Sequence, residues 1–297
     1  MNFKNIIVPI VLALTLASSI TLAKSVSNSI TESTRQEVQV QQIRNATIKI
    51  SYGNTIFLVD PMLSKKDTYP GFEGTYRSFM RMPMIELPMS VEDVIKDVDA
   101  VIVTHTHLDH WDDEAQSALP KAILLFTQNE ADAKLIRSQG FTNVKVLNDN
   151  TVFKNVELVK IGGQHGTDEM YAVPELAKLL GEAMGVVFKS PNSKTVYVAG
   201  DTIWNNYVSG AINTFNPDAI ILNTGYARLD GFKNSIIMGK EDAERAYHAT
   251  CNAKIIAVHM DTVNHTELTR SELHQFVQKK GIQNRVFIPA DGEVIKL

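Results

Sequence analysis

Three histidines and an aspartate stand within six residues of the chain, in the segment His105-Thr106-His107-Leu108-Asp109-His110. Ionisable groups crowded in this way carry desolvation costs unless a cation compensates them. Imidazole nitrogens and carboxylate oxygens are ligands for divalent transition metals. The spacing lets His105 and His107 converge on one ion, while Asp109 and His110 point towards a second. The segment therefore predicts a metal centre.

A buried strand must present this segment, because residues 98–103 are apolar except for Asp99 and end where the histidines begin. Three later apolar runs also end on potential ligands. They are residues 156–161 before His165, 195–199 before Asp201, and 253–258 before His259. Ligands carried repeatedly at strand ends are expected to converge on one rim of a sheet.

Strand and helix patterns alternate along the rest of the chain. Residues 46–52 and 55–59 predict a hairpin, and residues 90–97, 112–118, 128–139 and 240–250 predict helices. Further strands are expected at 122–126, 144–147 and 218–222. The pattern indicates an α/β fold with no internal repeat and no second domain boundary.

The segment from His105 to His110 resembles the signature of the metallo-β-lactamase superfamily, and His165, Asp201 and His259 follow it in the order and spacing of that family. The resemblance covers about residues 43–297 and implies an αββα sandwich, in which two mixed sheets are flanked by helices. It implies one metal on His105, His107 and His165, a second on Asp109, His110 and His259, and Asp201 as the bridge.

Short features resemble the branch of the superfamily that includes the ascorbate-phosphate lactonase. They are Asp60-Pro61 at a strand end, Gly200-Asp201-Thr202, and residues 289–293. The export signal described below departs from that cytoplasmic branch, which puts a sugar-phosphate substrate in doubt.

The predicted ligand set points to a dinuclear metal-dependent hydrolase. Two divalent ions, zinc first with manganese or iron as alternatives, would share a water and lower its pKa, so that a bridging hydroxide attacks the substrate. Asp109 would orient this water and accept its proton. His265 follows His259 in a loop rich in Asp and Thr, and is a candidate substrate contact or proton donor.

Several reactions fit such a site. Opening of a lactone or related ester is the first hypothesis, and phosphodiester or β-lactam hydrolysis would use the same metals. A metal-containing binding protein without turnover is the alternative from another class, and a di-iron oxidoreductase is a third. His248 and His274 lie in helical patterns and are predicted to be structural. We expect residues 62–90 and 166–185 to determine specificity.

Composition and the N-terminus set the context. The chain has 297 residues, is 44% hydrophobic and carries a net charge of -4. This charge gives no indication of nucleic-acid binding, so a small-molecule substrate is expected. Residues 1–23 resemble a cleavable signal peptide, and residues 24–42 a polar leader. The domain over 43–297 is thus expected to be exported, periplasmic or secreted, without stable membrane association after cleavage. The sequence does not determine the oligomeric state, and Cys251 is expected to be a buried, inert thiol.

Overall fold

The computed structural model describes Met1, residues 37–149 and residues 151–297. The predicted signal peptide, apart from Met1, and residues 24–36 of the predicted leader lie outside the described residues. Strand β1 (Val38–Arg44) begins five residues before the predicted start of the domain at residue 43. The leader prediction was therefore wrong for residues 38–42. Their glutamines make the segment polar in composition, although buried Val38 and Val40 alternate with less buried residues, as in a strand.

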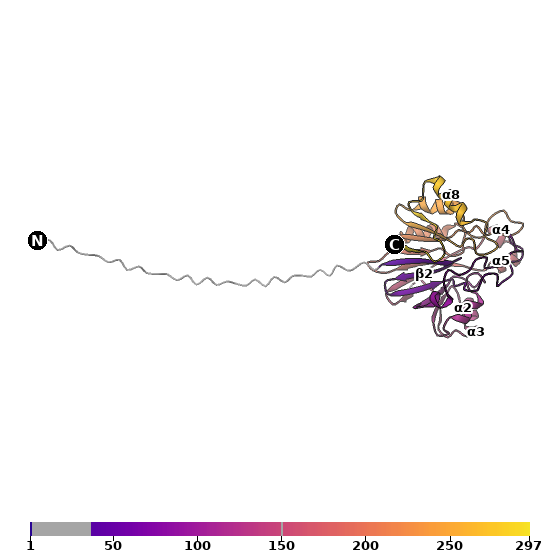
Figure 1. Ribbon diagram of the computed structural model, residues 1–297, viewed down its shortest axis with the longest axis horizontal. Helices are drawn as coiled ribbons and strands as arrows, with labels where there is room; N and C mark the ends of the chain where they lie inside the picture. Colours follow the sequence, from indigo (N-terminus) through magenta and orange to yellow (C-terminus); the bar gives the residue numbers. More distant parts are fainter. Residues whose placement is uncertain (2–36, 150) are drawn as a thin grey trace. The chain divides into compact units, whose positions relative to one another are not determined.

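Two seven-stranded mixed sheets form the centre of the molecule (Figure 1). The first sheet is antiparallel from β14 to β3 and parallel from β3 to β6. In spatial order its strands are β14 (Val294–Lys296), β1, β2 (Thr47–Tyr52), β3 (Thr55–Val59), β4 (Ala100–Val103), β5 (Leu124–Thr127) and β6 (Val144–Val146).

The second sheet repeats this arrangement, with antiparallel pairing from β7 to β10 and parallel pairing from β10 to β13. In spatial order its strands are β13 (Val286–Phe287), β12 (Lys254–Val258), β11 (Ala219–Asn223), β10 (Val196–Val198), β9 (Met184–Lys189), β8 (Val156–Gly162) and β7 (Thr151–Phe153).

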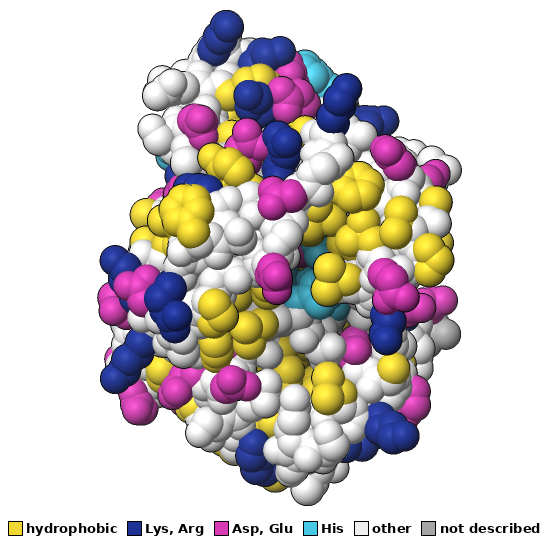
Figure 2. Space-filling view, turned by 90° about the vertical axis from the view of Figure 1, so that its right-hand side faces the viewer, with side chains coloured by type: hydrophobic (Ala, Val, Ile, Leu, Met, Phe, Trp, Pro, Cys, Tyr) yellow, Lys and Arg dark blue, Asp and Glu magenta, His cyan; other side chains and the backbone are white. Residues whose placement is uncertain are grey.

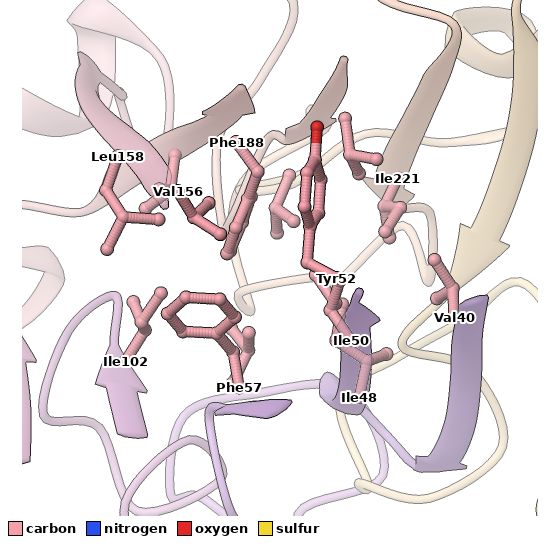
Figure 3. Packing of buried hydrophobic residues seen from close by; sticks show 14 of the residues in the cluster. Val40, Ile48, Ile50, Tyr52, Phe57, Ile102, Val156, Leu158, Phe188 and Ile221 are labelled. Carbon is pink, nitrogen blue, oxygen red and sulfur yellow. The ribbon is translucent and has the colours of Figure 1, made fainter. Parts of the chain in front are cut away.

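The inner faces of the two sheets share one hydrophobic core (Figure 3). Phe57 of the first sheet meets Phe188 of the second edge to face, with ring centroids 5.3 Å apart. Both rings are fully buried, and burial of each contributes roughly 1.5–3 kcal/mol. This packing fixes one sheet against the other, and so fixes the rim that both sheets share.

Helices cover the outer face of each sheet, as Figure 1 shows with α2 and α3 on one side and α8 on the other. The first sheet packs against α1 (Val91–Ile95), α2 (Asp113–Ala118) and α3 (Glu130–Ser138). The second packs against α6 (Asn206–Phe215), α7 (Lys240–Ala249) and α8 (Arg270–Lys280). Two short helices, α4 (Asp168–Tyr171) and α5 (Pro174–Leu180), lie at one end of the sandwich. The predicted αββα architecture is confirmed.

Two further observations concern the surface. Cys251 is exposed, so the expectation of a buried thiol was wrong: it lies in the turn between α7 and β12 instead of the core. In the described part of the chain, no helix is long and apolar enough to cross a membrane.

Candidate metal centre

The predicted ligands follow the ends of strands at one rim of the sandwich. His105 follows β4, His165 follows β8, Asp201 follows β10 and His259 follows β12. The backbone is tightly constrained there: Gly200 has a φ of +70°, and a Cβ at this position would lie 2.3 Å from the carbonyl oxygen of Met184. Only glycine allows this approach, which places Asp201 at the rim.

The structure brings all seven predicted ligands together in two groups, within each of which the ligand atoms lie within 4.8 Å of one another. The first, the three-histidine group, consists of His105, His107 and His165. The second, the aspartate–histidine group, consists of Asp109, His110, Asp201 and His259.

Asp201 lies between the two groups. Its Oδ2 atom is 3.1 Å from Nε2 of His110 and 3.7 Å from Nε2 of His165, which belong to different groups. Its other oxygen, Oδ1, accepts a hydrogen bond from Nδ2 of Asn223 at 2.6 Å. The carboxylate is therefore held between the two groups of candidate ligands, with its orientation fixed by Asn223.

Backbone carbonyls orient two rings of the three-histidine group. His107 Nε2 lies 3.0 Å from the carbonyl oxygen of Leu179, and His165 Nδ1 lies 3.1 Å from that of Ile236. A carbonyl oxygen can only accept, so each ring carries a proton on this outer nitrogen. In the neutral ring, the other nitrogen then presents a lone pair to the centre.

A buried carboxylate orients the other two rings of the first motif. Asp60 Oδ2 accepts hydrogen bonds from His110 Nδ1 at 2.9 Å and from Thr104 Oγ1 at 2.7 Å. Because the Thr104 hydroxyl donates to Asp60, it accepts from Nδ1 of His105, 3.1 Å away. Both rings thus turn Nε2 inwards, as metal-binding histidines with such outer partners do.

These donors fit metal ions. In the three-histidine group, His105 Nε2 lies 3.0 Å from His107 Nδ1. Two facing lone pairs repel each other at this distance unless a cation lies between them, and imidazole nitrogen is a strong ligand for divalent metals. The cluster of histidines and aspartates is therefore able to bind metal ions.

Burial and neighbouring charges shift the pKa values of the histidines of the centre in different directions. Burial lowers the pKa of His105, and lowers that of His165 to about 4, so both rings are neutral near pH 7. Burial acts in the same direction on His110 and His259, but Asp201 and its neighbours outweigh it: the pKa of His110 is raised, and that of His259 is raised to about 9. Without metal, the aspartate–histidine group therefore holds protons on these histidines.

The pKa values of the two aspartates are lowered, whereas those of His110 and His259 are raised. Burial would raise the pKa of Asp109 and of Asp201, but the charge on His110 lowers both well below the ordinary range. Both carboxylates are ionised near pH 7 and are available as ligands.

A pocket of about 270 Å³ opens onto the centre. Figure 2 shows histidine side chains at the bottom of a hollow, with hydrophobic side chains around it. The lining residues are Phe72, Glu73, Thr75, His107, Leu108, Asp109, His165, Leu179, Leu180, Leu229, Ile236 and His265. The two segments expected to determine specificity thus both contribute to its wall, and a third segment around 229–236 does so without having been predicted.

His265 lies on the wall of this pocket and belongs to neither metal group. Its ring packs edge to face on Phe72, with centroids 5.0 Å apart, and its Nδ1 has no hydrogen-bond partner among the described residues. Burial lowers its pKa to about 4. A neutral ring facing the pocket can contact a substrate, whereas His248 and His274 lie on α7 and α8 and join neither group.

Two supporting residues were not predicted. Asp60 orients His110, and Asn223 holds Asp201. Asp60 is visible in the sequence as the polar residue that ends a hairpin strand, and Asn223 as the residue that ends a later strand, but neither position alone indicates a partner far along the chain.

Comparison with known proteins agrees with this geometry. The family described as "Beta-lactamase superfamily domain" matches residues 55–260. This chain belongs to the metallo-β-lactamase superfamily. It is 48% identical over 257 residues to the UPF0173 protein YddR of Bacillus subtilis (strain 168), covering 86% of this chain and 98% of YddR.

Two solved structures are similar along most of the chain. One is a possible metal-dependent hydrolase from Veillonella parvula DSM 2008, with 51% identity, a TM-score of 0.87, and coverage of 88% of this chain and 100% of that one. The other is an isothiocyanate hydrolase from Delia radicum gut bacteria, with 47% identity, a TM-score of 0.84, and coverage of 86% and 98%. The protein is a metal-dependent hydrolase of the metallo-β-lactamase superfamily.

Proposed function

We propose that this protein is a dinuclear metal-dependent hydrolase of small, neutral, apolar substrates, and that isothiocyanates are the leading class. The observation that carries the proposal is the pocket, whose apolar walls surround three of the seven predicted ligands, His107, Asp109 and His165. The similarity to an isothiocyanate hydrolase supports the choice of substrate.

The charge of the pocket argues against anionic substrates. Among the described residues that line it, none is lysine or arginine, while Glu73 and Asp109 are acidic. Phosphate and carboxylate groups are usually bound by arginine or lysine. The proposed metal ions would be the only cations beside an anionic group in this pocket, so we rank phosphodiesters, sugar-phosphate lactones and β-lactams that carry a carboxylate below neutral substrates. Neutral lactones fit the same apolar walls, and they remain the second candidate.

The metals would be held by the three-histidine group and the aspartate–histidine group, with Asp201 between them. Nitrogen and oxygen donors without a thiolate suit zinc, and also manganese or iron. When bound, two such ions supply a nucleophile from water near neutral pH and polarise the substrate.

Hydrolysis of an isothiocyanate needs one water and a proton acceptor. The water oxygen bonds to the central carbon of R–N=C=S, and one water proton moves to nitrogen, which gives a thiocarbamic acid. Its remaining acidic proton then moves to nitrogen as the C–N bond breaks, which releases the amine and carbonyl sulfide. Asp109, ionised and open to the pocket, accepts and returns the proton. His265, which lines the same pocket, orients the substrate.

The test is hydrolysis by purified protein of known metal content, in parallel panels of isothiocyanates, neutral lactones, phosphodiesters and β-lactams. We expect amine release from benzyl isothiocyanate, and its loss in Asp109→Ala. Turnover confined to phosphodiesters or β-lactams would overturn the substrate class. Full metal content with tight ligand binding and no turnover in any panel would favour a binding protein. The export predicted from residues 1–23 belongs to this proposal, and the mass of the chain purified from its host tests it.

A further inference from the structure

The α4–α5 segment, which we define as residues 168–181, holds one ligand of the three-histidine group. The carbonyl oxygen of Leu179, in the last turn of α5, accepts the hydrogen bond from Nε2 of His107 at 3.0 Å. His107 is only partly buried, whereas His105 and His165 are buried. The orientation of the His107 ring therefore depends on the position of the last turn of α5.

One hydroxyl group connects this segment to a second ligand. Tyr171, the last residue of α4, accepts a hydrogen bond from the backbone N–H of His165 at 3.2 Å and donates one to the carbonyl oxygen of Gly181 at 2.8 Å. Gly181 caps α5 directly after Leu179 and Leu180. The phenol thus ties the backbone of His165 to the helix end that orients His107.

The same segment forms part of the pocket wall. Leu179 and Leu180 line the pocket, and Leu180 packs so closely on Gly166 that a Cβ there would lie 3.0 Å from its Cδ1 atom. Met170 Sδ would lie 3.1 Å from the same Cβ. A movement of α5 that frees His107 would therefore also move the wall beside His165.

The aspartate–histidine group is held differently. Its outer partners Asp60 and Asn223 lie at the ends of β3 and β11 and are buried. Among the described residues, no hydrogen bond joins the α4–α5 segment to a side chain of this group. Asp60 also reaches His105 of the three-histidine group through the hydroxyl of Thr104, but only the three-histidine group is held by the α4–α5 segment.

We propose that Tyr171 is a positioning residue, which couples metal binding at the three-histidine group to the closure of the pocket wall formed by the α4–α5 segment. The proposal rests on the two-metal centre of the proposed function, but it does not depend on the identity of the substrate. The role of Tyr171 can therefore be disproved while the protein is shown to hydrolyse isothiocyanates. Equally, the role of Tyr171 can be confirmed while the protein is shown not to hydrolyse them.

The first experiment measures binding of Co²⁺ to metal-free protein by its absorption spectrum, with a competing chelator to set the free concentration. In Tyr171→Phe, we expect one of the two ions to bind about 3- to 10-fold more weakly, since loss of outer support commonly weakens metal binding. His107→Gln should affect the same ion more strongly. Asp60→Asn should weaken the other ion more, because Asp60 contacts His110 directly and His105 only through Thr104. Equal binding of both ions by Tyr171→Phe and the unmodified protein would overturn the proposal.

Tyr207→Phe is the matched control, because Tyr207 is an exposed residue of α6 and its hydroxyl bonds to no candidate ligand among the described residues. It removes the same atom and should leave both affinities unchanged.

The second experiment measures amide hydrogen exchange of residues 168–182 with and without metal. We expect metal to slow exchange in the unmodified protein and in Tyr207→Phe, and to slow it much less in Tyr171→Phe. Exchange that does not respond to metal in the unmodified protein would contradict the coupling, whatever the affinities show.

Discussion

Asp60 accepts a hydrogen bond from Nδ1 of His110 at 2.9 Å, although fifty residues separate the two in the chain. The same carboxylate accepts from the backbone N–H and the hydroxyl of Thr104, both at 2.7 Å. Three donors therefore use both oxygens of Asp60. They fix the ring of His110 with Nε2 towards Asp201, and this is how the hairpin β2–β3 contributes to a site that it does not reach directly.

Asp60→Asn should weaken metal binding at the aspartate–histidine group about 10- to 100-fold, as losses of such outer partners commonly do. The amide cannot accept from all three donors, because its NH₂ group would face either the N–H of His110 and the hydroxyl of Thr104, or the backbone N–H of Thr104. Chelator competition with zinc measures the loss. Asp218→Asn is the control, because Asp218 accepts from the backbone of Thr195 near the start of β11 and should not alter metal affinity. Unchanged affinity in Asp60→Asn would contradict the role of this contact.

His265→Ala should lower kcat/KM for the preferred substrate at least about tenfold, because a substrate contact or proton donor is lost. Metal content should stay the same, since His265 belongs to neither metal group. His248→Ala, on the exposed surface of α7, is the control and should change neither quantity. Loss of a bound metal together with activity would show that His265 acts as a ligand instead.

The metal-free protein should lose stability as the pH rises from about 6.5 to about 9. Burial alone would lower the pKa of His259, but Asp201 and Asp109 raise it to about 9. The unfolded chain has a histidine pKa of about 6.5. The folded state thus binds the proton of His259 more tightly than the unfolded chain does. This proton's contribution to the free energy of unfolding is complete below pH 6.5 and lost above pH 9.

Urea unfolding of metal-free protein between pH 6 and pH 9.5 measures this effect. Metal replaces the proton, so the metal-loaded protein should not show the same decline. A free energy of unfolding that rises over this range in the metal-free protein would contradict the assigned charge of the aspartate–histidine group.

The sequence predicted those features that depend on local pattern. Buried strands followed directly by His105, His165, Asp201 and His259 were visible as such, since parallel strand ends meet at one rim. The role of Asp60 was not visible, because it depends on a contact between a hairpin and a turn fifty residues away. The wall residues Leu229 and Ile236 were missed for the same reason, since they lie in an irregular segment whose path is set by tertiary packing.

Strand β1 was missed because its composition resembled that of a polar leader. Its glutamines resemble a polar leader in composition, and only pairing with β2 and β14 makes residues 38–42 a strand. Gln39 and Gln41 are half-buried and Gln42 is buried, so their polar character does not indicate a leader, and the alternation with the buried Val38 and Val40 places the segment in the sheet.

The central claim is that two metal ions together support hydrolysis of a small, neutral, apolar substrate. The most direct test adds zinc stepwise to metal-free protein and measures the rate of amine release from benzyl isothiocyanate at each step. We predict little activity until the first equivalent is bound, and a rise that ends at the second. Full activity at one equivalent, or none at two, would contradict the account.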